Sequence, residues 1–306
     1  MGIFPRGLLP MSKRKDGKNM FSRFNLSGLT EEFFGGKDAC EKYQKHYRKD
    51  VLGLTDEDEE NDLFGLTDED KENDLFRKTL RHYLQANGNL DAATMEEEWF
   101  GSVQADIFLS HSHRDETLIE AFAGWLHEKC GVFAFVDSSL WGYADDLLLE
   151  IDNDYCKNDG KNTYSYELRN ISTSYVHMIL NTALAKMIYQ TECLIFVNTE
   201  NSTIKENITD ESKTLSPWIY SELALSKIIE PHEPQEYLKH SFILNESEGP
   251  QIPIELPAEI EHLDTLTTQH LTDWASAIEI LKQNGRELTG SDSLILLYWD
   301  LYENRK

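Results

Sequence analysis

Short, nearly continuous runs of apolar residues alternate with amphipathic stretches from about residue 105 onward. Three of these runs are five or six residues long and rich in residues that favour strands: ADIFLS (105–110), VFAFV (132–136) and CLIFV (193–197). Runs of this kind, apolar on both faces, are typical of strands buried inside a parallel sheet. We therefore predict three central strands at these positions.

A helix is predicted between the first two strands, because apolar side chains recur at helical spacing over residues 116–129. Strand, helix and strand with short connections form a βαβ unit, and its repetition predicts an α/β fold, a flavodoxin-like doubly wound parallel sheet. Helices near 271–283 and 291–303 are expected to close the domain. Three later segments compete for the last one or two strand positions: FILN (242–245), IPIEL (252–256) and HLDTL (262–266).

The first hundred residues have a different pattern, in which Tyr, Leu and Phe recur every three to four positions. This spacing predicts a mainly helical N-terminal region over residues 1–100, disordered at its beginning, followed by a domain over residues 101–306. Within the N-terminal region, residues 53–76 are an acidic tandem repeat with a period of 12 residues. We interpret the repeat as two solvated helix starts rather than calcium loops, because Asn61 and Asn73 stand where an EF-hand loop requires glycine.

Composition narrows the classes of partner and the compartment. The chain of 306 residues has a formal net charge of −26, and duplex binding depends on Lys and Arg, so no nucleic-acid partner is expected. No run reaches the roughly 18 apolar residues of a membrane span, and the N-terminus lacks the order of a signal peptide, so no membrane partner is expected either. The four cysteines are scattered without a C-x-x-C pair, which argues against disulfides and structural zinc and indicates a cytoplasmic protein.

One carboxylate interrupts the apolar face of a predicted helix. In SPWIYSELALS, Ser216 is a good N-cap and Pro217 suits the first helical position. At helical spacing Trp218, Glu222 and Leu225 fall on one stripe. A carboxylate there is unfavourable unless something uses it, and the helix follows the third predicted strand, near the strand ends where α/β sheets bind ligands. By itself the pattern favours the alternative, a structural glutamate that reaches solvent or pairs with a nearby Lys or Arg.

Three segments resemble bacterial TIR (Toll/interleukin-1 receptor) domains in the order that the family requires. They are ADIFLSHSHRDETLIEAFAGWL, then VFAFVDSSLWGYADDLLLEID, which contains the counterpart of the mobile BB loop, and SPWIYSELALS, which is similar to the helix with the catalytic glutamate. The resemblance implies a TIR fold for residues 101–306, with a long polar insertion at residues 157–175 that compact members lack. It also makes Glu222 the expected catalytic residue.

The resemblance assigns further residues to substrate binding: Ser110, His111, Ser112, Arg114, Asp137, Trp141, Tyr143 and Trp218. The pair His111 and His113 allows a second interpretation, because an H-x-H pattern can present two imidazoles to a metal. No third ligand is evident at metal spacing, so we expect no metal, and instead hydroxyls and amides that donate to a phosphate or ribose. A serine hydrolase is disfavoured because the chain has no G-x-S-x-G motif.

The connection at residues 137–146, after the second predicted strand, contains Trp141 and Tyr143 on either side of Gly142. Such aromatics either cover the sheet edge or stack on a ligand or partner. The resemblance implies that TIR domains associate through this loop. We therefore expect a homo-oligomer whose contacts include residues 137–146.

The resemblance implies an NAD+ nucleosidase that needs no cofactor, because NAD+ is its substrate. Nicotinamide leaves as a neutral molecule, so a single carboxylate, Glu222, is sufficient if it stabilises the oxocarbenium-like charge on the ribose. The product is ADP-ribose, a cyclic isomer or a conjugate, made as an immune signal for a separate effector or through NAD+ depletion in antiphage defence. Two alternatives stay open: a non-enzymatic TIR adaptor or scaffold, and a glycosidase that acts on other nucleosides or nucleotides.

Overall fold

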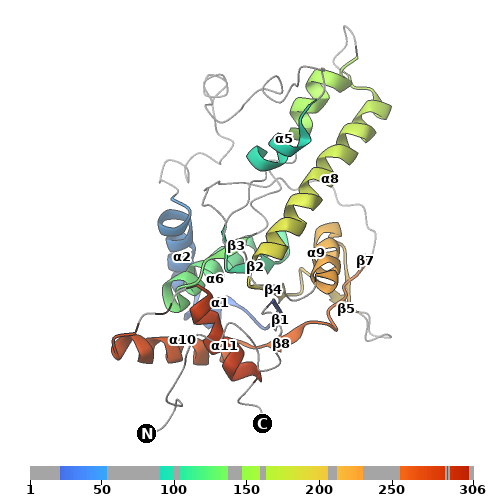
Figure 1. Ribbon diagram of the computed structural model, residues 1–306. Helices are drawn as coiled ribbons and strands as arrows, with labels where there is room; N and C mark the ends of the chain where they lie inside the picture. The colour runs from blue at the N-terminus through green and yellow to red at the C-terminus, as the bar shows by residue number, and fades with distance from the viewer. Residues whose placement is uncertain are drawn as a thin grey trace.

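Five parallel strands form the central sheet, in the order β3-β2-β4-β1-β8 (Figure 1). Their bounds are Ser22–Ser27 (β1), Ile107–Ser110 (β2), Ala134–Val136 (β3), Cys193–Asn198 (β4) and Asp264–Leu266 (β8). The computed structural model describes residues 21–53, 90–99, 104–136, 147–158, 163–205, 212–229, 256–286, 288 and 290–302. The α/β class and the parallel sheet are confirmed, and the arrangement is compatible with a flavodoxin-like fold.

Alternation along the strands divides the core into two layers. Ile107 and Leu109 of β2 belong to one hydrophobic cluster together with Ile195 of β4. Phe108 of β2 and Phe196 of β4 belong to the other cluster. We call the side of Ile107 the first face of the sheet and the side of Phe108 the second face. All five side chains are fully buried, as expected for a parallel sheet covered on both sides.

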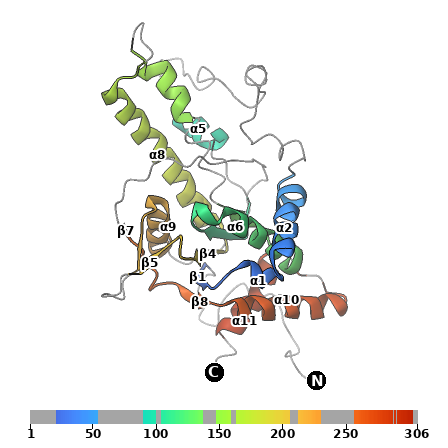
Figure 2. The same ribbon diagram turned by 180° about the vertical axis from the view of Figure 1, so that it is seen from behind.

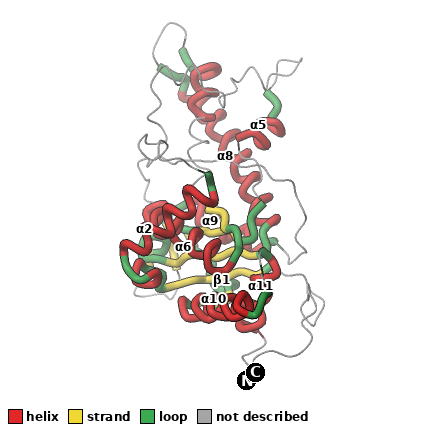
Figure 3. Tube along the Cα trace, turned by 90° about the vertical axis from the view of Figure 1, so that its left-hand side faces the viewer, coloured by secondary structure: helices red, strands yellow, loops and turns green. Residues whose placement is uncertain are grey.

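Helices cover both faces, to the left and right of the sheet in Figure 1, and Figure 3 looks onto the first face. The first face carries α1 (Glu31–Phe34), α2 (Lys37–His46), the π-helical turn η1 (Tyr47–Val51), α6 (Glu116–Trp125), η4 (Leu126–Cys130), α10 (Thr268–Gln283) and α11 (Ser291–Tyr302). The second face carries α5 (Ala92–Trp99), α8 (Tyr166–Gln190) and α9 (Pro217–Ile228), and η5 (Asp152–Cys156) packs against α8. A short 3₁₀ turn, η3 (His113–Asp115), precedes α6.

Strand β1 corrects the predicted domain boundary. The sequence pattern predicts a separate helical region over residues 1–100, yet β1 lies inside the sheet, paired in parallel with both β4 and β8. Its apolar residues Phe24 and Leu26 are fully buried. Two apolar residues that alternate with polar ones are too short a pattern to indicate a strand whose partners lie far along the chain. The described part of the N-terminal region therefore belongs to the same sheet as residues 104–302.

Helix α2 is docked tightly against α6 (Figure 2). A Cβ atom added at Gly124 of α6 would lie 2.0 Å from the carbonyl oxygen of Tyr43, so the two backbones approach as closely as glycine allows. The Tyr47 hydroxyl donates to the carbonyl oxygen of Ala134 in β3, with an O···O distance of 3.1 Å. These contacts attach the N-terminal helices to the sheet.

Of the remaining predicted elements, some lie in the central sheet, some lie elsewhere, and some lie outside the described residues. HLDTL contains β8, whereas Leu256 at the end of IPIEL lies in a small antiparallel sheet of β5 (Ile204–Lys205), β6 (Ser212–Thr214) and β7 (Leu256–Pro257). FILN and residues 54–76 of the acidic repeat lie outside the described residues. The second half of the polar insertion forms the first turns of α8. No helix in the described segments is long and apolar enough to cross a membrane.

Candidate functional site

The order of the strands reverses between β2 and β4. The chain leaves β2 through α6 on the first face to reach β3, and it leaves β3 through α8 on the second face to reach β4, on the other side of β2. Open α/β sheets bind ligands at such a switch point, beyond the carboxyl ends of the strands. The ends of β2 at Ser110 and of β4 at Asn198 therefore mark the candidate site.

Ser110 and Glu222 are in contact at this place. Ser110 has the same parity as Phe108 along β2, so its side chain points to the second face, where α9 packs. The Ser110 hydroxyl donates a hydrogen bond to Oε2 of Glu222, with an O···O distance of 2.6 Å, and both residues are fully buried. Two residues that the sequence predicts as part of one site thus lie together, although 112 positions separate them.

The local sequence fixes the position of Glu222 on α9. The Ser216 side chain caps the helix by accepting a backbone N–H of the first turn at 3.3 Å, and Pro217 occupies the first turn, as predicted. One turn after Glu222, the buried Ser226 hydroxyl is hydrogen-bonded to Nε2 of His262 at 2.8 Å. The helix is held on both sides of Glu222, so the carboxylate has a fixed place against the end of β2.

The polar side chains of the loop after β2 differ in their burial and in their contacts. His111 is buried, and its Nδ1 lies 3.2 Å from the carbonyl oxygen of Leu109. Its ring stands edge-on to that of His113, with 6.3 Å between the centroids. Ser112 is partly buried at the start of η3, and Arg114 is exposed. In the part of the chain that the structure describes, no group of three or more His, Cys, Asp or Glu side chains could hold a metal ion.

A second polar contact joins the loops that follow β2 and β4. Asp115 accepts a hydrogen bond from Oγ1 of Thr199 at 2.5 Å and another from Nδ2 of Asn201 at 2.7 Å. The site residues predicted from the sequence include neither Asp115 nor Thr199 nor Asn201. Thr199 and Asn201 follow a buried parallel strand directly, which is the one signal in the sequence that could have indicated them.

Glu116 begins α6 beside this loop. Burial raises the pKa of the Glu116 carboxyl above its ordinary value, and the nearby Glu120 raises it further, while Arg48, His111 and His113 lower it. Ionisation of Glu116 is thus opposed both by burial and by a like charge.

The other predicted site residues are divided between α9 and undescribed segments. Trp218 is partly buried against the core cluster of the second face, and its ring lies 5.5 Å from that of His177 on α8. It contributes to the attachment of α9 to α8. Asp137, Trp141 and Tyr143 lie outside the described residues.

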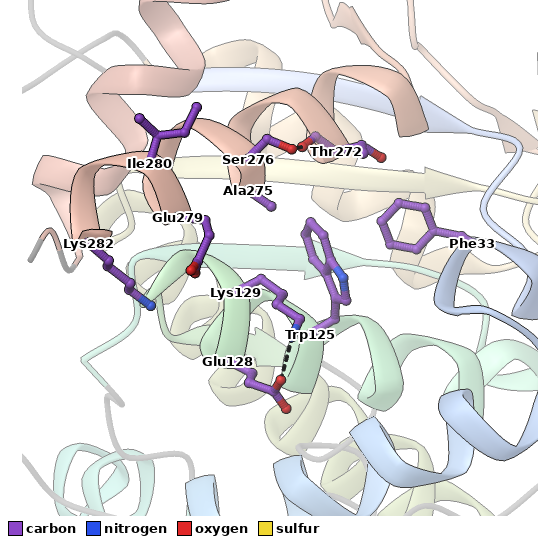
Figure 4. A pocket seen from close by; sticks show the side chains of 10 residues that line it. All are labelled: Phe33, Trp125, Glu128, Lys129, Thr272, Ala275, Ser276, Glu279, Ile280 and Lys282. Atoms are coloured by element: carbon purple, nitrogen blue, oxygen red, sulfur yellow. Dashed lines mark hydrogen bonds and ion pairs between the residues drawn. The ribbon is translucent and has the colours of Figure 1, made fainter. Parts of the chain in front are cut away.

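A groove of about 630 Å³ lies elsewhere, between α10 and the α6–η4 helix on the first face (Figure 4). Phe33 and Trp125 line one part of it, and the nearby Glu128 and Lys129 form an ion pair at 2.6 Å. The groove is open and its floor, Trp125, is almost fully buried. We place the site at the strand ends instead, because the buried carboxylate and the switch point coincide there.

Comparison of the chain with protein-family models, with curated proteins and with solved structures found no match. The functional assignment therefore depends on the residues at the ends of β2 and β4. Their arrangement joins a fully buried carboxylate, a hydroxyl donor and the start of a helix at one edge of the sheet.

Proposed function

We propose that this chain is a TIR-type NAD+ nucleosidase in which Glu222 is the catalytic carboxylate. The observation that carries the proposal is the buried hydrogen bond from Ser110 to Glu222 at the switch point of the sheet. A carboxylate buried at the ligand-binding edge of an α/β sheet, rather than elsewhere in the core, favours a functional role over a structural one. The resemblance of the surrounding segments to TIR domains supplies the reaction.

Glu222 acts on the ribose that carries nicotinamide. As the C–N bond breaks, positive charge grows on the anomeric carbon and ring oxygen, and a fixed carboxylate stabilises that charge more in the transition state than in the ground state. The nicotinamide departs as a neutral molecule, so the step needs no strong general acid. Ser110 is a positioning residue, since its hydroxyl holds Oε2 of Glu222 at 2.6 Å and fixes the direction of the carboxylate.

The start of α6 is suited to the diphosphate of the substrate. The amides after η3 point toward the carboxyl edge of the sheet, and Arg114 is exposed beside them. The Asp115 side chain is engaged with Thr199 and Asn201, which keeps that carboxylate directed at the neighbouring loop.

Substrate entry requires movement around Glu222. The side chain is 0% exposed, so the nicotinamide ribose reaches it only when the groups that cover the end of β2 separate. A slow opening step before catalysis is therefore part of the proposal. Assembly of several chains, including contacts through residues 137–146, would be one means of favouring the open form.

The test is to incubate the purified full chain with NAD+ and to measure nicotinamide release by chromatography, beside a panel of other nucleotides. We expect Glu222→Gln to lower the rate of nicotinamide release by at least about 100-fold. The melting temperature should be unchanged or slightly raised, because a buried carboxylate is often a functional feature that opposes stability.

The matched control is Glu279→Gln, the same chemical change at an exposed position of α10. This variant should retain the full rate. Release of nicotinamide by a folded Glu222→Gln protein would remove Glu222 from the mechanism. Cleavage of other nucleotides without NAD+ would indicate a different glycosidase, and binding without cleavage of any of them would favour an adaptor.

A further inference from the structure

Helix α8 carries a stripe of exposed apolar side chains at regular spacing. Leu168 is 45% exposed, Ile171 52%, Tyr175 68% and Met178 64%, and Thr182 continues the stripe as an exposed residue. We call these five residues the outer stripe. Their spacing of three and four positions in turn is the a/d repeat by which two helices pack against each other.

The opposite side of α8 is the side that packs on the protein. Val176, Leu180, Ala183 and Met187 are buried in the core cluster of the second face. At about 100° per residue, these positions point roughly opposite to the outer stripe. Figures 1 and 3 show α8 extending away from the sheet, with α5 beside its outer part. One side of α8 therefore packs against the core of the protein, and the outer stripe faces outward.

Charge is depleted around the outer stripe. Residues 170–185 contain no Asp, Glu, Lys or Arg, in a chain that is 27% charged and has a net charge of −26. Depletion of charge at the centre of an exposed surface is the compositional mark of a protein interface.

We propose that the outer stripe of α8 binds the outer stripe of a second copy of this chain, forming a symmetric dimer. Most surfaces of a chain with a net charge of −26 repel a second copy, so contact is least opposed where charges are absent. An a/d stripe is complementary to itself, which suits the two-fold symmetry of most homodimers. An oppositely charged partner would instead be recognised by acidic surface, which this part of α8 lacks.

The size of the outer stripe is sufficient for a reversible dimer. Its large side chains form an apolar patch on the order of 400 Å², as large as the largest patch on ordinary monomers. Standard interfaces bury roughly 800 Å² per partner, so the stripe would be the centre of the contact and flanking polar residues its rim. Tyr175 lies in the middle of the stripe, where aromatic residues contribute most to affinity.

Sedimentation of the full chain over a concentration series tests the proposal. We expect a dimer at micromolar concentration, and a dissociation constant at least about 30-fold weaker for the double variant Tyr175→Glu/Met178→Glu. Both positions are exposed, so circular dichroism should show an unchanged fold. The control is Asn170→Glu, which adds a negative charge to the same helix at an exposed position outside the outer stripe and should leave the dimer intact.

Crosslinking gives a second readout that does not depend on affinity. All four native cysteines are buried, so a disulfide formed between two chains can be attributed to a cysteine introduced at the surface. Under mild copper-phenanthroline oxidation, Tyr175→Cys should form a disulfide-linked dimer, because the centre of the stripe meets itself in either helix direction. Asn170→Cys should not.

A chain that stays monomeric at all concentrations would overturn the proposal. So would a dimer that the double variant leaves unchanged, since it would form through another surface. The proposal is independent of NAD+ cleavage: an inactive protein that dimerises through α8 leaves it standing, and an active monomer refutes it.

Discussion

The two ends of the strand pair β2 and β4 both carry buried or partly buried carboxylates, but in different surroundings. At the amino ends, Asp106 precedes β2 and Glu192 precedes β4, and burial together with the neighbouring Asp106 raises the pKa of Glu192 to about 7. At the carboxyl ends, Glu222 and Asp115 each accept hydrogen bonds from hydroxyl groups. At the amino ends Glu192 lies beside a second carboxylate, whereas at the carboxyl ends Glu222 and Asp115 are in contact with hydroxyl donors.

The difference shows that burial of a carboxylate does not by itself indicate function. Ionisation of Glu192 is opposed by desolvation and by a like charge, so that residue affects the stability of the fold. A carboxylate that accepts a hydrogen bond from a hydroxyl is directed in space. This second arrangement, at the ligand-binding edge, is the one that a reaction can use.

The largest expected effect on stability is at the amino end. Because the pKa of Glu192 is raised in the folded protein, its favourable contribution is full below about pH 4.5 and is lost as the pH rises through about 7. Glu192→Gln should therefore raise the free energy of unfolding at pH 8 by on the order of 2 kcal/mol, with little change at pH 4. Urea denaturation at both pH values measures this. Equal effects at the two pH values would mean that ionisation of Glu192 is not what limits stability.

A smaller effect is expected at the carboxyl end from Ser110→Ala. Loss of one hydroxyl donor should lower kcat by about tenfold with little change in KM, because Ser110 directs Glu222 without binding substrate. Ser110→Thr keeps the hydroxyl and should recover most of the rate. A fall in stability without a change in kcat would show that this hydrogen bond is structural, like the contacts at the amino end.

The smallest effect is expected from Asp115→Asn. The amide keeps one acceptor oxygen but turns an NH₂ group toward either Thr199 or Asn201, so one of two hydrogen bonds is lost. The free energy of unfolding should fall by about 1 kcal/mol, as is usual for one partly exposed hydrogen bond. Hydrogen exchange of the amides at 199–203 should accelerate while that of β4 stays unchanged. Unchanged exchange in that loop would show that Asp115 does not hold it.

Elements with a strong local pattern could be predicted from the sequence. The continuous apolar runs gave β2, β3 and β4, and the N-cap Ser216 with Pro217 gave the start of α9. Helical periodicity also placed Glu222 on the apolar stripe of α9, and its burial in the structure agrees. Each of these inferences depends only on residues within one or two turns or one strand.

Features that depend on distant partners could not be predicted in this way. Strand β1 has only Phe24 and Leu26 as buried apolar residues, and its neighbours β4 and β8 supply the hydrogen bonds that make it a strand. The contact of Asp115 with Thr199 and Asn201 joins two loops that are adjacent only because β2 and β4 pair. Local spacing contains no information about which loops such pairing brings together.

Strand β1 also has a consequence for biosynthesis. It leaves the ribosome well before β4 and β8, the two strands between which it lies. Parallel pairing between distant segments forms slowly, and an unpaired strand edge is prone to associate with other chains. Until β4 and β8 have been synthesised, this short segment has no place in the sheet. We therefore expect the nascent chain to need protection from aggregation until β8 has left the ribosome.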